Sequence, residues 1–170
     1  MLDKKDEDTT PIEKTHEPMM RLITFHIANE IYGVEVCNVR EILLINQNFP
    51  VPGAPDHVLG ITNIRGNVVT IIDARKRFDL PEIDFSNPIY KESARMIVVE
   101  AGNETAAVLV DSVSDVIDVE KSAVDLSPKI KLNNDSRFIS GVVSHSDGLV
   151  IILNVDKFLS DDELDMVAGF

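Results

Sequence analysis

The chain has 170 residues, of which 44% are hydrophobic, and its formal net charge is −13. This length can build one sizeable core or two small ones. The negative charge argues against nucleic acid or an anionic lipid surface as a partner, because both need a positive protein surface.

Export, membrane insertion and disulfide formation are not expected. The start of the chain is acidic and lacks an apolar signal region. The longest run without a charged residue, residues 42–55, contains three prolines and cannot serve as a membrane span. The single cysteine, Cys37, cannot form an internal disulfide, which suits a reducing cytosol. We therefore expect a cytoplasmic protein.

The acidic residues are enriched at both ends of the chain. Residues 1–20 carry six acids and three bases, and residues 160–170 carry four acids and no base. We predict a disordered acidic tail over residues 1–19, one folded domain over residues 20–160, and an acidic C-terminal extension over residues 161–170.

The first part of the domain reads as strand, turn, helical turn and loop. Residues 23–27 alternate apolar and polar side chains, which predicts a half-buried strand. Residues 28–30 fit a hairpin turn. Residues 39–43 place apolar side chains at i, i+3 and i+4, which predicts one or two helical turns. Prolines assign residues 46–55 to a loop.

Two hairpins and a linker are predicted further along the chain. Arg65 precedes Gly66 at a turn, and the β-branched residues 68–72 that follow predict a covered strand. Residues 80–88, rich in proline and acid, read as a linker. Asp147-Gly148 is a hairpin signal between two apolar segments.

The domain repeats itself. Residues 21–30 align with residues 95–104, and residues 60–72 align with residues 141–153 in the same order. Duplication predicts an all-β fold with short helices, built from two small units packed together. We expect these units at residues 20–88 and 92–160, and a strand crossing from one unit to the other remains open.

No residue pattern in the chain supports catalysis or cofactor binding. The histidines His16, His26, His57 and His145 have no metal-ligand spacing. Cys37 is interpreted as a half-buried structural thiol. Asp73 follows a strand, and we expect it to pair with Arg75, Lys76 or Arg77 in a structural role. An enzyme using Asp73 or Cys37 is the rival hypothesis, and it lacks a nucleophile motif. We expect no cofactor and no metal.

The segment Asn63-Ile-Arg-Gly-Asn-Val-Val-Thr-Ile-Ile-Asp-Ala-Arg75 resembles the Asn-Leu/Ile-Arg-Gly signature of the CheW-like family of bacterial chemotaxis coupling proteins. Further blocks agree in order and spacing, so that the likeness covers residues 20–160. The resemblance implies two SH3-like five-stranded β-barrels packed on one another. It also implies a non-catalytic adaptor that links methyl-accepting chemoreceptors to the histidine kinase CheA through its regulatory domain.

The resemblance also implies which residues bind the receptor tip. These are Val39 and Glu41 on the short helix, Gly60 before the strand, and Asn63 with Arg65 at the turn. An apolar groove between the barrels would accept one face of a helical hairpin, and Glu41 and Arg65 would fix its register. Gly60 would let the partner's backbone approach closely. The kinase contact is expected at hydrophobic barrel ends.

Other interpretations keep the same domain but place it in a different protein or pathway. The chain could be a CheW-like module of a larger signalling protein, either a CheV-type adaptor or a CheA regulatory domain. It could also serve a non-flagellar chemosensory pathway. Recruitment to membrane-associated receptor arrays is expected in each case. A binder of proline-rich peptides is disfavoured, because the sequence lacks the aromatic residues such a groove needs.

Overall fold

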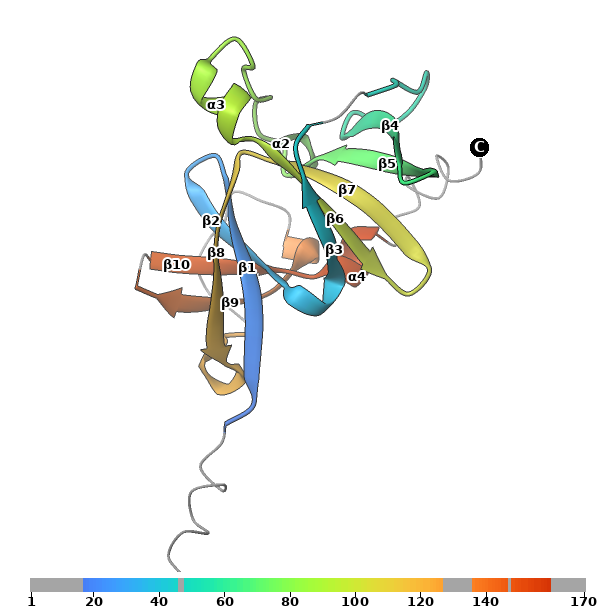
Figure 1. Ribbon diagram of the computed structural model, residues 1–170. Coiled ribbons are helices and arrows are strands. Elements are labelled where there is room, and N and C mark those ends of the chain that lie inside the picture. Colours follow the sequence, from blue (N-terminus) through green and yellow to red (C-terminus); the bar gives the residue numbers. More distant parts are fainter. Residues whose placement is uncertain (1–16, 46–47, 127–135, 147, 160–170) are drawn as a thin grey trace, which may run out of the picture.

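The computed structural model describes residues 17–45, 48–126, 136–146 and 148–159. In these ranges the chain forms two five-stranded sheets with short helices at their ends (Figure 1). The prediction of a mainly β fold with two five-stranded units is confirmed. None of the helices in this part of the chain has the length and apolar content needed to cross a membrane.

The first sheet has the strand order β8-β1-β2-β10-β9, and the second has the order β3-β6-β7-β5-β4. The strands of the first sheet are β1 (Met19–Ile27), β2 (Glu30–Glu35), β8 (Ser112–Glu120), β9 (Ile139–His145) and β10 (Gly148–Leu153). The strands of the second sheet are β3 (Val39–Leu43), β4 (Val58–Ile64), β5 (Asn67–Asp73), β6 (Arg95–Ala101) and β7 (Glu104–Val110). The helices are η2 (Val36–Asn38), α2 (Ala74–Arg77), α3 (Pro88–Ser93), η3 (Lys121–Ala123), η4 (Ser136–Phe138) and α4 (Val155–Leu159).

Each sheet combines strands from both sequence repeats. The first sheet takes β1 and β2 from the first repeat and β8, β9 and β10 from the second. The parallel pairs β2–β10 and β5–β7 are two of the places where the repeats meet. The sheets therefore do not match the sub-barrel ranges 20–88 and 92–160 expected from the sequence, because strands are exchanged between the repeats.

Most of the two predicted tails lies outside the described residues. The predicted tail over residues 1–19 overlaps β1 at Met19, and residues 1–16 lie outside the described residues. The C-terminal extension at residues 161–170 and the turn residue Asp147 also lie outside them.

The helical turn predicted for residues 39–43 is wrong, because this segment is the edge strand β3. A register irregularity lies between Val39, which pairs with Val99, and Glu41, which pairs with Val98. This bulge gives β3 an apolar spacing that imitates a helix, since Val39 and Ile42 face the same way. The short helix of this region is η2, which precedes the strand.

Cys37 lies on η2 and is exposed, so the expectation of a half-buried thiol is also wrong.

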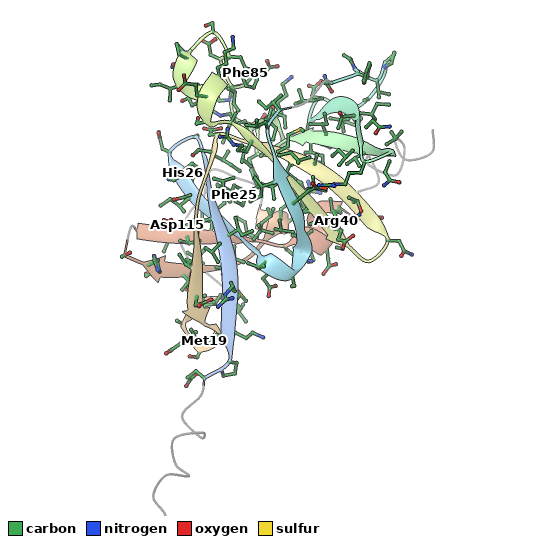
Figure 2. All side chains as sticks on the ribbon, in the orientation of Figure 1. Met19, Phe25, His26, Arg40, Phe85 and Asp115 are labelled. Carbon is green, nitrogen blue, oxygen red and sulfur yellow. The ribbon has the colours of Figure 1, made fainter. Side chains whose placement is uncertain are left out.

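The largest core cluster draws residues from both sheets and from α2 and α4, whereas two smaller clusters each belong mainly to one sheet. Phe25, labelled in Figure 2, and Tyr32 stack at a centroid distance of 5.9 Å, and Tyr32 and Phe78 stack at 5.3 Å. Tyr32 is fully buried, and its hydroxyl has no hydrogen-bond partner among the described residues. The aromatic side chains therefore pack the two sheets into one body.

A buried ion pair joins the two sheets at one end. Arg75 on α2 donates two hydrogen bonds to Asp111, of 2.9 and 2.6 Å, and the two side chains are only 11% and 6% exposed. Asp111 Oδ2 also accepts a hydrogen bond from the backbone of Ala28 at the β1–β2 turn. The hydrogen bond to Asp111 raises the pKa of Arg75.

The role expected for Asp73 is corrected in one respect. Its side chain caps α2 by accepting a 3.0 Å hydrogen bond from the backbone N–H of Arg75, and the guanidinium of Arg75 pairs with Asp111 instead. Burial raises the pKa of Asp73. Lys76 pairs with Glu82. Asp73 thus has a structural contact at the start of a helix.

Candidate functional site

Glu41 on β3 and Arg65 at the β4–β5 turn form an ion pair on the surface of the second sheet. Arg65 Nη2 lies 3.0 Å from Glu41 Oε1, and Arg65 Nε lies 3.2 and 3.3 Å from the two carboxylate oxygens. The Arg65 side chain is 77% exposed and that of Glu41 is 21% exposed. The hydrogen bond from Arg65 lowers the pKa of Glu41. Because β3 and β4 are opposite edges in the strand order, the pair connects two edges that curvature brings together.

The β4–β5 turn fixes the position of Arg65. The register partners Ile64 and Asn67 leave two turn residues, and both have positive φ, 52° at Arg65 and 86° at Gly66. Positive φ at both positions is the pattern of a two-residue hairpin that matches the strand twist. Asn63 Oδ1 accepts a 2.9 Å hydrogen bond from the backbone N–H of Gly66. Asn63 therefore stabilises the turn from which the arginine extends.

Val39 and Glu41 lie on opposite faces of the sheet. The bulge described above pairs Val39 with Val99, a residue of the cluster between the sheets. Glu41 pairs with Val98, which belongs to the cluster of the second sheet alone. Val39 is half-buried against the inter-sheet cluster. The structure thus brings Glu41, Asn63 and Arg65 together and places Val39 behind them.

The space in front of Gly60 is filled by the chain's own backbone, contrary to the expectation of a partner there. Gly60 is buried, and a Cβ at this position would overlap Asn48 Oδ1 and the carbonyl of Phe49. Phe49 and Ile61 exchange two backbone hydrogen bonds of 2.9 Å each, which hold this segment against the β4 edge. Gly60 therefore permits a crossing of the chain over its own sheet.

The second repeat has the same arrangement at its aligned glycine. A Cβ on Gly141 would lie 2.6 Å from Val124 Cγ1 and 3.0 Å from the carbonyl oxygen of Asp125. Asp125 forms a bridge with Val142, as Phe49 does with Ile61. Glycine is thus required at both positions for the same reason, because a segment of the chain crosses the sheet where a side chain would otherwise lie.

Exposed apolar side chains lie on the elements that carry the ion pair. We call Leu44, Ile45, Phe49 and Val68 the apolar rim. Val68 is the register partner of Asn63, and Phe49 is the bridge partner of Ile61, so Val68 and Phe49 lie along the β4–β5 hairpin. Leu44 and Ile45 directly follow β3.

Sequence reasoning missed this rim. An apolar residue in a strand is ordinarily assigned to the core, and Val68 fits that rule. The available signal was the position of Leu44, Ile45 and Phe49 in or beside a proline-rich loop, where apolar side chains have no core to enter.

The described residues hold no cluster of three or more His, Cys, Asp or Glu side chains that could bind a metal ion. His57 is buried, and its ring nitrogens contact Nη1 of Arg77. The site on the second sheet therefore consists of a preformed ion pair, a fixed turn and exposed apolar side chains. Such a set of groups is suited to binding a protein surface.

A family profile described as "CheW-like domain" matches residues 21–163. The chain belongs to the CheW family. It is 28% identical over 154 residues to the "Chemotaxis protein CheW" of Treponema pallidum, covering 91% of this chain and 90% of that protein. It is also 28% identical over 145 residues to the "Chemotaxis protein CheW" of Klebsiella aerogenes, covering 85% and 84%.

The CheW fold is shared with a solved structure. The crystal structure of the scaffolding protein TtCheW from Thermoanaerobacter tengcongensis matches with a TM-score of 0.72 and 26% identity, covering 80% of this chain and 89% of that one. The CheW-like fold expected from the sequence is thus confirmed. The protein is a CheW-type scaffold of chemotaxis, and it is not an enzyme.

Proposed function

We propose that this protein couples methyl-accepting chemoreceptors to the histidine kinase CheA, and that the receptor tip docks at the Glu41–Arg65 pair. The observation that carries the proposal is the exposed guanidinium of Arg65, held by a rigid turn beside the apolar rim. Kinase coupling would use the regulatory domain of CheA. The protein would act in the cytoplasm, at receptor arrays.

The geometry suits a helical partner. An exposed ion pair contributes about 0–1 kcal/mol to stability, so the Glu41–Arg65 pair adds little to the stability of the fold. An amphipathic helix could place its apolar face on the rim residues Phe49 and Val68. Its polar side chains would then meet Arg65 and Glu41, which fix the register of the contact.

The remaining residues of the predicted site would act indirectly. Val39 packs the β3 edge onto the inter-sheet cluster, and Asn63 holds the turn. Gly60 admits the segment that carries Phe49. In this proposal they position Glu41, Arg65 and the rim, and the partner does not need to touch them.

The test is binding of a receptor signalling-tip fragment to the Arg65→Ala variant. We expect a loss of about 2 kcal/mol, roughly 30-fold in Kd, which is typical of an arginine anchor at an interface. Kinase activation in a mixture of receptor fragment and CheA should fall in parallel. Far-UV circular dichroism and thermal unfolding should show that the variant folds.

The matched control is Arg21→Ala. Arg21 also forms an exposed pair, with Asp118 at 2.8 and 3.2 Å, but it lies on β1 of the first sheet. A second control is Arg40→Ala. Arg40, labelled in Figure 2, precedes Glu41 on β3 and pairs with Glu100. Receptor affinity that is unchanged in Arg65→Ala, or equally reduced in all three variants, would refute the assignment.

A further inference from the structure

The chain passes between the two sheets at two places, and one of them is a single residue. The first crossing is η2, which lies between β2 and β3. The second is Asp111, which separates the end of β7 at Val110 from the start of β8 at Ser112 (Figure 1). A rotation of one sheet against the other must therefore be accommodated at η2 and at Asp111.

Asp111 is bonded to elements of both sheets. On the side of the first sheet, its backbone N–H donates a 3.0 Å hydrogen bond to the carbonyl of His26, and its carboxylate accepts one of 2.9 Å from the backbone N–H of Ala28. On the side of the second sheet, Arg75 of α2 donates two hydrogen bonds to the same carboxylate. Ser93, which precedes β6, donates a 2.9 Å hydrogen bond from Oγ to the Asp111 carbonyl. The residue at the crossing is thus fixed to both sheets.

The Arg75–Asp111 pair restrains direction as well as distance. The apolar cluster between the sheets resists their separation, but hydrophobic burial is non-directional. Two charge-assisted hydrogen bonds between a guanidinium and a carboxylate form only in one relative orientation of the two groups. Because the pair is buried, loss of this orientation leaves charges that water cannot solvate. The pair therefore opposes rotation of the first sheet against α2 and the second sheet.

We propose that Asp111, held by Arg75, is a positioning residue for the coupling of receptor and kinase. It fixes the angle between the two sheets, and this angle transmits the state of a receptor bound at the Glu41–Arg65 pair to the kinase. The inference rests on the function proposed above. The residues that bond to Asp111 lie outside the Glu41–Arg65 pair and the apolar rim. A loosened crossing should therefore impair coupling while the receptor still binds.

The first test separates binding from coupling in the full-length Asp111→Asn variant, at a temperature where circular dichroism shows it to be folded. The Kd for a receptor signalling-tip fragment should stay within about twofold of the parent value, because Asp111 and Arg65 share no partner among the described residues. The kinase activity of a mixture of receptor fragment, CheA and the variant should fall about fivefold or more, the scale of a typical coupling free energy. The matched control is Asp118→Asn, which breaks an exposed pair on β8 and should change neither quantity.

Two further variants distinguish orientation from stability. Adding Arg75→Met to Asp111→Asn removes the buried charge and should raise the urea midpoint of unfolding again, but the directional hydrogen bonds stay absent. The kinase activity should therefore stay low in this double variant. Ile152→Ala opens a cavity in the cluster of the first sheet, so it should lower the urea midpoint and keep the kinase activity, because the pair is intact. Kinase activity that follows the urea midpoint across these variants would overturn the proposal.

The restraint between the sheets can also be measured without a partner, as the width of a distance distribution between two spin labels. Labels at Ser144→Cys on β9 and Glu104→Cys on β7, in a Cys37→Ser background, occupy exposed positions on the two sheets. Asp111→Asn should broaden the distribution, whereas Ile152→Ala should not. An unchanged distribution in Asp111→Asn, or full kinase activity, would overturn the proposal. A parent protein that gave no receptor-dependent kinase activity would instead refute the proposed function.

Discussion

The buried pair of Arg75 and Asp111 offers the sharpest test of how the two sheets are held together. Asp111→Asn removes the negative charge but keeps an amide oxygen that can accept the hydrogen bond from Ala28. The guanidinium of Arg75, with 11% of its side chain exposed, then lacks its carboxylate. The substitution therefore removes the charge and one of the two acceptors that face Arg75, because the amide NH2 takes the place of Oδ1, and it leaves the backbone contact of the β1–β2 turn in place.

The expected magnitude follows from the burial of the pair. Removing one partner of a buried ion pair costs about 3–5 kcal/mol, because the other charge remains desolvated. Arg75 keeps a 3.2 Å hydrogen bond to the carbonyl of Pro81 and a contact with the ring of Tyr90, 5.2 Å from its centroid. These contacts place the expected loss at the lower end, about 3 kcal/mol.

Urea unfolding followed by circular dichroism measures this loss as a change in the free energy of unfolding. The matched control is Asp118→Asn, which breaks the exposed pair with Arg21 and should cost no more than about 1 kcal/mol. Adding Arg75→Met to Asp111→Asn should restore part of the loss, because no buried charge then remains. If Asp111→Asn costs no more than Asp118→Asn, the reasoning is refuted.

Three further predictions use the same measurement. Tyr32→Phe should leave stability unchanged or raise it by about 1 kcal/mol, since the hydroxyl has no partner among the described residues; a clear loss would reveal a hidden partner. Gly60→Ala and Gly141→Ala should each destabilise the protein by about 1–3 kcal/mol through overlap with the crossing segment, and a neutral effect would contradict the packing at both glycines. Because burial raises the pKa of Asp73 above its ordinary 3.8, the unfolded chain ionises first, and the stability this residue contributes at low pH is lost as the pH rises through its folded pKa. The stability of Asp73→Asn relative to the parent protein should therefore increase as the pH rises above the ordinary pKa of aspartate, and a difference that stays constant with pH would exclude this linkage.

The sequence predicted the strands better than their partners. Alternation and β-branched runs report which residues are covered, so residues 23–27 and 68–72 were assigned correctly as strands. Residues 39–43 were assigned to a helix because a bulge between Val39 and Glu41 changes the apolar spacing. Apolar residues three positions apart can lie on one face of a helix or on one face of a bulged strand, and only the pairing with β6 distinguishes these two structures.

Contacts between distant residues explain what the sequence could not show. The order of strands in each sheet depends on which repeat a strand pairs with, and two similar repeats offer equivalent partners. Arg75 has three nearby acids in sequence, whereas its carboxylate partner, Asp111, lies beyond two further strands. For the candidate site, family likeness indicated Glu41 and Arg65, but neither spacing nor composition could reveal their ion pair. The sequence could not predict that Phe49 covers Gly60, because the loop between these two residues could follow many paths.

The exchange of strands has a consequence for how this scaffold is made and how it works. The chain leaves the first sheet after β2 and returns to it only at β8, so neither half of the sequence contains a complete sheet. A ribosome must release almost the whole polypeptide before β10 can settle beside β2. The same interlacing ties the sheets by two short backbone crossings. Two partners bound at opposite ends of such a body would be held at a fixed angle to each other.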